Sequence, residues 1–125
     1  MQKFHVIVVL TITFATCYGC TIDKQGVYLT EMPTNPVLII HQNTLYVKTL
    51  NSIKNSAFCI YKVNISVDNS QKAIYLSAYQ ALCGSKPYRD NFQIKLSKYK
   101  VSEPNLFEFY WRDPDKKITK LGITP

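Results

Sequence analysis

The sequence predicts an all-β protein that folds as a single two-sheet β-sandwich, and three observations lead to this prediction. Short segments rich in β-branched and aromatic residues recur at roughly ten-residue intervals through most of the chain. Turn-forming residues separate these segments, and no stretch after the N-terminal leader has helical periodicity. About seven or eight short strands of this kind are typical of a sandwich, with a barrel as the alternative.

The first half of the domain predicts short, closely spaced strands. Residues 26–31 (GVYLTE) form the first expected strand, which ends at the turn Met32–Pro33. Residues 37–41 (VLIIH) and 44–50 (TLYVKTL) follow, and Gln42–Asn43 is expected to join them as a tight turn.

Residues 57–67 alternate between apolar and polar side chains, which is typical of a half-buried strand. Cys59 and Tyr61 belong to the apolar parity and are expected to face the core, whereas Asn64 should face solvent. A polar turn then leads into a further expected strand over 72–82.

The last third of the chain predicts a loop over 84–90 and then three more strands. Residues 91–101 alternate, with Phe92, Ile94 and Leu96 expected to face inward, and 117–123 form a weak final edge strand. Residues 106–112 should bury three aromatic side chains on one face, namely Phe107, Phe109 and Trp111.

The N-terminal leader predicts export. Lys3 gives a basic start, an apolar run of about ten residues follows from Val6 to Ala15, and small residues then permit cleavage. This run is about half as long as a membrane-spanning helix. We expect residues 1–17 to be a signal peptide, with the cut as late as residue 19, and residues 18–125 to form one domain without a transmembrane anchor. The mature protein is expected to be secreted or to reside in the endoplasmic reticulum lumen.

Composition and charge narrow the classes of partner. The chain is 46% hydrophobic and 13% aromatic, which excludes a disordered composition. Its formal net charge of +7 falls to about +6 when Lys3 leaves with the leader. In an exported protein this charge suits acidic glycans, acidic receptor faces or a lipid surface, and nucleic acid is not expected as a partner.

The cysteines form an odd set after cleavage. Cys17 lies at the expected cut, so Cys20, Cys59 and Cys83 remain. An oxidising compartment favours one disulfide and one leftover thiol, and spacing alone leaves the pairing open.

The residues offer no catalytic or metal-binding constellation. His41 is the one histidine after the leader, and the cysteines lack the close spacing of zinc sites. Asp113 and Asp115 flank Pro114 and are interpreted as turn formers rather than as paired carboxylates. We therefore expect a non-enzyme that uses no cofactor.

Two sequence features suggest sites on the protein surface, one for glycosylation and one for binding a partner. Asn64-Ile65-Ser66 is an acceptor sequence for N-glycosylation. The stretch that follows Cys83 is rich in basic and aromatic residues that are expected to be exposed. Such residues are favoured at recognition surfaces. The candidate partner-binding residues there are Lys86, Tyr88, Arg89, Lys95, Lys98, Tyr99 and Lys100.

Two parts of the chain carry short motifs whose order along the sequence is informative. The first is Gln25-Gly26-Val27-Tyr28-Leu29-Thr30-Glu31-Met32-Pro33, together with the leader and Cys20 before it. The second runs from Cys83 through Phe92-Gln93-Ile94-Lys95 to Val101-Ser102-Glu103-Pro104-Asn105-Leu106-Phe107. In their shared order these motifs resemble the immunoglobulin-like accessory proteins of coronaviruses. The middle of the chain, about 37–57, aligns poorly. The resemblance implies an immunoglobulin-like sandwich of antiparallel strands.

The resemblance also implies a disulfide between Cys20 and Cys59. The family partner of Cys83 falls at Thr34, so Cys83 is expected to be buried and inert or to link two copies in a homodimer. Functionally, it implies a viral accessory protein that binds a host cell-surface or luminal protein and modulates host immune responses. The alternative is a small viral glycoprotein with a structural or assembly role.

Overall fold

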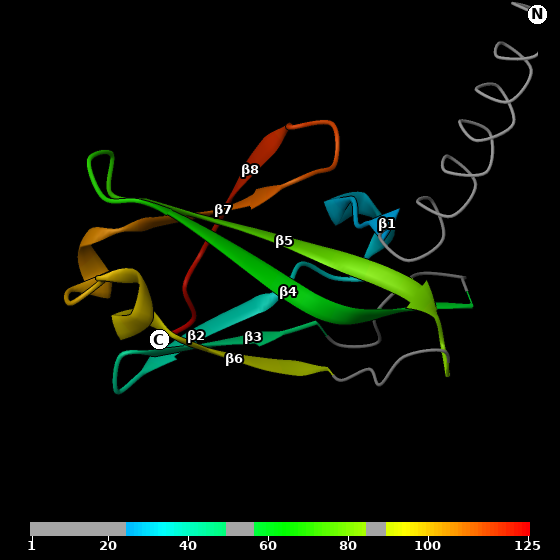
Figure 1. Ribbon diagram of the computed structural model, residues 1–125, viewed down its shortest axis with the longest axis horizontal. Helices are drawn as coiled ribbons and strands as arrows, with labels where there is room; N and C mark the ends of the chain where they lie inside the picture. Colours follow the sequence, from blue (N-terminus) through cyan, green and yellow to red (C-terminus); the bar gives the residue numbers. More distant parts are fainter. Residues whose placement is uncertain (1–24, 50–56, 85–89) are drawn as a thin grey trace, which may run out of the picture.

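The computed structural model describes residues 25–49, 57–84 and 90–125, which form eight strands in two sheets (Figure 1). The all-β class is therefore confirmed. The larger sheet contains β1 (Gln25–Gly26), β4 (Phe58–Asp68), β5 (Ala73–Leu82), β7 (Glu108–Arg112) and β8 (Ile118–Leu121). The smaller sheet contains β2 (Val37–His41), β3 (Thr44–Lys48) and β6 (Asn91–Lys95).

Several sequence-based predictions fall on residues outside these ranges. They concern the signal peptide and its cleavage, Cys17 and Cys20, and the candidate binding residues Lys86, Tyr88 and Arg89. Within the described ranges, no helix has the length and apolar character needed to cross a membrane.

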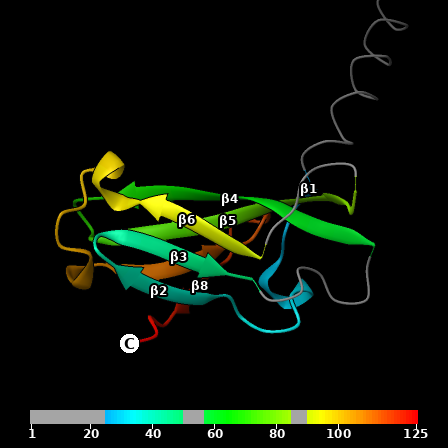
Figure 2. The ribbon, with the colours of Figure 1, turned by 90° about the horizontal axis from the view of Figure 1, so that it is seen from below.

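The smaller sheet begins with a tight hairpin. Gln42 and Asn43 join β2 to β3 with φ angles of 50° and 58°, so both residues adopt the left-handed conformation that a two-residue hairpin turn requires. The predicted turn is thus confirmed. Strand β6 then pairs with β3, and Figure 2 shows the three strands lying side by side.

The larger sheet is organised around the long β4–β5 hairpin, whose two strands pair antiparallel along their full length. A β-bulge at Tyr61 interrupts the register, because Ile60 lies opposite Gln80 while Lys62 lies opposite Tyr79. The extra residue reverses which parity faces the core. Cys59 therefore lies on the outer face, and the prediction that it points inward is wrong.

The larger sheet is mixed rather than fully antiparallel. Strand β7 runs parallel to the first half of β5, from Ala73↔Glu108 to Leu76↔Trp111. Strand β8 pairs antiparallel with β7 and forms the expected last strand at the edge. The expectation of antiparallel strands throughout is therefore wrong at the β5–β7 pairing.

Two predicted strands are shorter than expected because other hydrogen bonds satisfy their backbones. After β1 the chain forms the 3₁₀ turn η1 (Leu29–Glu31), where the Glu31 carboxylate accepts the Tyr28 N–H at 2.8 Å. After β6 it forms η2 (Leu96–Tyr99), which ends at left-handed Lys100. A third 3₁₀ turn, η3 (Pro104–Leu106), precedes β7.

The two sheets enclose one hydrophobic core. Both sheets contribute to it, and the aromatic side chains predicted for 106–112 lie inside. Its largest fully buried members are Trp111, Phe109, Leu38, Leu45, Ile60, Ile74, Leu76 and Leu96.

The disulfide links Cys59 to Cys83, and the two Cα atoms lie 5.1 Å apart. The Cys83 N–H donates to the Ala57 carbonyl at 2.9 Å, so Cys83 continues the β4–β5 pairing beyond Leu82. The bond therefore joins neighbouring strands of one sheet. The expected Cys20–Cys59 pair is wrong, and so are a free or inert Cys83 and a homodimer through it, because the bulge turns Cys59 toward Cys83.

We predict that Cys83→Ser lowers the free energy of unfolding by about 3 kcal/mol, because the bond closes a loop with a sequence separation of 24. Denaturant unfolding of the oxidised wild type and the variant measures this difference. Cys59→Ser and the double variant should match Cys83→Ser. A peptide map that links Cys59 to Cys20 would contradict the assignment.

Candidate functional site: the outer face of the large sheet

Tyrosines gather on the face of the large sheet that points away from the core. This face is defined by the alternate residues of three strands, because their neighbours Ile74, Leu76 and Trp111 are fully buried. A sheet face that meets water is normally polar. Here it carries Tyr61, Tyr75, Tyr79 and Tyr110 together with Lys62, Asn64, Ser77 and Arg112, and we call this set the tyrosine face.

The tyrosines are ordered by stacking against one another. The Tyr61 and Tyr79 rings lie 6.5 Å apart between centroids, and the Tyr75 and Tyr110 rings lie 5.5 Å apart. Both pairs have an interplanar angle of 25°. Offset stacking of this kind contributes about 0.5–1.5 kcal/mol for each pair beyond area burial. The rings are therefore held in place while a minor part of the surface of each tyrosine remains accessible.

Arg112 adds a cation to this face. Its guanidinium carbon lies 4.3 Å from the centroid of the Tyr75 ring, within the range of a cation–π interaction. In the part of the chain that the structure describes, Arg112 has no carboxylate within ion-pair distance. Its charge therefore remains available to a ligand.

Glu108 and Lys120 form a small polar network with Tyr110 at one end of the tyrosine face. The Tyr110 hydroxyl donates to the Glu108 carboxylate at 2.6 Å, and the Lys120 ammonium group lies 3.3 Å from the same carboxylate. The bond from Tyr110 and then the interaction with Lys120 lower the pKa of Glu108. The same bond raises the pKa of Tyr110, since ionising the phenol would remove its donor.

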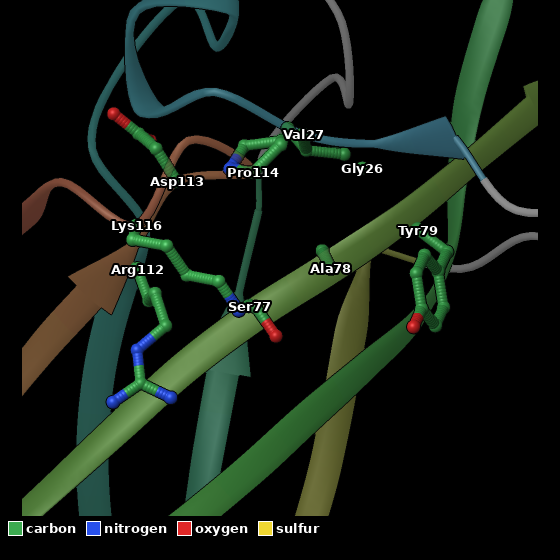
Figure 3. Close-up of a pocket in the computed structure, with 9 residues that line it drawn as sticks. All are labelled: Gly26, Val27, Ser77, Ala78, Tyr79, Arg112, Asp113, Pro114 and Lys116. Atoms are coloured by element: carbon green, nitrogen blue, oxygen red, sulfur yellow. The ribbon is translucent and has the colours of Figure 1, made fainter.

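A pocket opens beside the tyrosine face where β5 changes partners. Strand β7 pairs with β5 as far as Leu76, and β1 pairs with it from Tyr79. Ser77 and Ala78 lie in the interval and form the floor of a pocket of about 370 Å³. The walls come from Gly26 and Val27 on one side and from Arg112, Asp113, Pro114 and Lys116 on the other (Figure 3).

Hydrogen bonds fix the walls of this pocket. The Gln80 amide donates to the Gly26 carbonyl at 2.8 Å, and the Trp111 indole donates to the Val27 carbonyl at 3.2 Å. The Asp113 carboxylate accepts the Leu29 N–H at 2.9 Å, and in Figure 3 it points away from Ser77. Asp113 is thus more than the turn former expected from the sequence, because it anchors the segment after β1.

The predicted site residues are only partly brought together. Lys95, Lys98, Tyr99 and Lys100 are all exposed, but they do not form one strand face, because Lys95 ends β6 and the other three lie in η2 or directly after it. Asn64 lies opposite Ser77 on the tyrosine face, so its expected outward orientation is confirmed. His41 is exposed at the end of β2.

Sequence reasoning missed the pocket and most of the tyrosine face. The alternation of residues 57–67 predicts a core position for Tyr61, and this prediction is wrong because the bulge has no local sequence marker. The alternation that predicts the buried Phe109 and Trp111 also predicts that Tyr110 and Arg112 face outward. This part of the tyrosine face could therefore be predicted from sequence. Within the described ranges, no group of three His, Cys, Asp or Glu residues is arranged to hold a metal ion.

Comparisons with known proteins do not assign the chain to a class. No family model, no curated protein and no solved structure matches it.

We predict that Gly26→Ala destabilises the protein by about 1–3 kcal/mol, the usual range for overpacking. A Cβ on Gly26 would lie 2.6 Å from Cγ of Pro114, a rigid ring that cannot rotate away. Thermal unfolding measures the loss. Gly122→Ala is the matched control, since nothing lies within 4 Å of the Cβ it would add, and an equal loss in both variants would contradict the argument.

We predict that Tyr110→Phe raises the pKa of Glu108 toward its ordinary value, because the largest cause of the lowering is removed. The stability that Glu108 contributes is present above its unfolded pKa and is lost as the pH falls through its lower folded pKa. Carboxyl-carbon NMR titration of both proteins measures the shift.

Lys120→Gln should also raise the pKa of Glu108, since it removes both the hydrogen bond and the charge of Lys120 that lower it. An unchanged Glu108 titration in Tyr110→Phe would show that the bond does not form in solution.

Proposed function

We propose that this protein is a non-catalytic recognition domain that binds a host cell-surface or luminal protein through the tyrosine face. The observation that carries the proposal is the ordered set of stacked tyrosines with Arg112 among them on a solvent-facing sheet. Tyrosine and arginine are the residue types that most often dominate binding energy at protein interfaces.

Order in the free protein favours binding. Each immobilised side chain costs an interface conformational entropy, and rings that are already stacked lose little more on binding. The Arg112 guanidinium is likewise placed by the Tyr75 ring before any partner arrives. The tyrosine face therefore combines large contact area with a low ordering cost.

The resemblance to the immunoglobulin-like accessory proteins of coronaviruses supplies the biological setting of the proposal. In that setting the chain is exported to the secretory pathway of a host cell and modulates immune responses by holding a host protein. The two-sheet β architecture and the oxidised Cys59–Cys83 pair are compatible with this proposal.

A binding assay with host membrane proteins tests whether the partner binds the tyrosine face or the basic and aromatic stretch predicted from sequence. Tyr79→Ala removes one ring of a stacked pair, whereas Tyr99→Ala removes an exposed tyrosine in η2. We expect Tyr79→Ala to weaken capture of a saturable host partner at least tenfold, as hot-spot truncation does, and Tyr99→Ala to leave it unchanged.

Circular dichroism should show that both variants remain folded. Loss with Tyr99→Ala alone, or the absence of any saturable host partner, would overturn the proposal. Stoichiometric incorporation into purified viral particles, without a host partner, would favour the structural role instead.

A further inference from the structure

We propose that the pocket between β1 and β7 binds the anionic group of an acidic sugar, either a carboxylate or a sulfate ester. The pocket joins the tyrosine face at Ser77 and Tyr79. The inference rests on the proposed function in one respect, because a host glycoprotein would carry the sugar.

Two cations line the pocket, and the Arg112 guanidinium lies over the Tyr75 ring at its rim. Arg112 and Lys116 both line it, and Figure 3 shows the Lys116 side chain running toward Ser77. Among the residues that the structure describes, neither cation has a carboxylate within ion-pair distance. The nearest acidic side chain in the lining, Asp113, is buried and bonded to the Leu29 N–H. The two cations therefore outnumber the one carboxylate of the lining, and an excess of positive charge in a cleft concentrates anions.

Hydrogen bonds of the β7–β8 turn hold the Lys116 backbone beside the pocket. Its N–H donates to the Asp113 carbonyl at 2.9 Å, and the Asp113 N–H donates to the Lys117 carbonyl at 2.9 Å. Lys116 occupies the left-handed position of this turn with a φ of 76°. Glycine is favoured at such a position, so the turn itself gains nothing from a lysine side chain.

The size and lining of the pocket favour a sugar over a single acidic side chain. Its volume of about 370 Å³ lies within the range of small-molecule sites, and a lone carboxylate would fill little of it. The Ser77 hydroxyl and the strand backbones offer hydrogen bonds to ring hydroxyls. The Tyr79 and Pro114 rings offer apolar surfaces against which a pyranose ring can pack.

Direct titration with small sugars tests the pocket without any host protein. The probes are 3′-sialyllactose for the carboxylate, a 6-sulfated N-acetylglucosamine for the sulfate ester and lactose as the neutral sugar. We expect saturable shifts of the Ser77, Tyr79 and Lys116 amide signals with at least one acidic probe and none with lactose. The stronger acidic probe identifies the anionic group.

Lys116→Gly is the decisive variant, because it removes one cation while relieving the left-handed conformation. We expect about a tenfold loss of affinity, which corresponds to one charge-assisted hydrogen bond, with unfolding stability equal to or above wild type. Lys72→Gly is the matched control, since Lys72 is also left-handed, with a φ of 53°, but lies in the β4–β5 turn outside the pocket. It should bind the sugar as wild type does.

The results separate this inference from the proposed function. No saturable shift with either acidic probe, or equal affinity of wild type and Lys116→Gly, overturns the sugar site. Host capture that survives both Lys116→Gly and sialidase treatment of the host protein, but not Tyr79→Ala, also overturns it while supporting recognition by the tyrosine face. Acidic-sugar binding without a host protein partner supports the pocket and counts against the proposed function.

Discussion

Strand β5 pairs with three neighbouring strands, and the arrangement of the rest of the large sheet depends on these pairings. One side of β5 pairs with β4 along its whole length. The other side is divided between β7, which pairs with the first part, and β1, which pairs near the end. The strand direction differs on the two parts, because β7 is parallel and β1 is antiparallel. The pocket at Ser77 and Ala78 is a direct consequence of this division.

The bulge at Tyr61 decides what the outer face carries. One extra residue in β4 places Ile60 in the core before the bulge and Val63, Ile65 and Val67 against it afterwards. The same residue leaves Cys59 on the outer side, where Cys83 lies within disulfide range. A covalent bond within a single sheet closes the open end of the hairpin and leaves the packing between the sheets to the apolar core.

Much of the fold could be predicted from local sequence, because alternation and turn chemistry are local properties. The β2–β3 hairpin and the burial of Phe109 and Trp111 follow from short windows of residues. The bulge, the parallel β5–β7 pairing and the Asp113–Leu29 bond depend on partners that are distant in sequence. Lys116 could not be recognised as a pocket residue for the same reason, since Ser77 and Gly26 meet it only in the folded chain.

The position of Asn64 links the predicted glycan to both proposed surfaces. Asn64 lies directly opposite Ser77 in the β4–β5 ladder, so a glycan on its amide would begin one strand away from the pocket floor. The neighbouring outer positions, Lys62 and Ser66, lie opposite Tyr79 and Tyr75. An N-glycan is bulky and hydrophilic, and it would cover part of the tyrosine face from the β4 side. The approach that remains open is from β7 and the turn that carries Lys116, where Arg112 and Lys116 have no ion-pair partner among the described residues. A partner that binds glycosylated protein must therefore enter over Arg112 and Lys116, which makes the cationic edge the natural point of first contact.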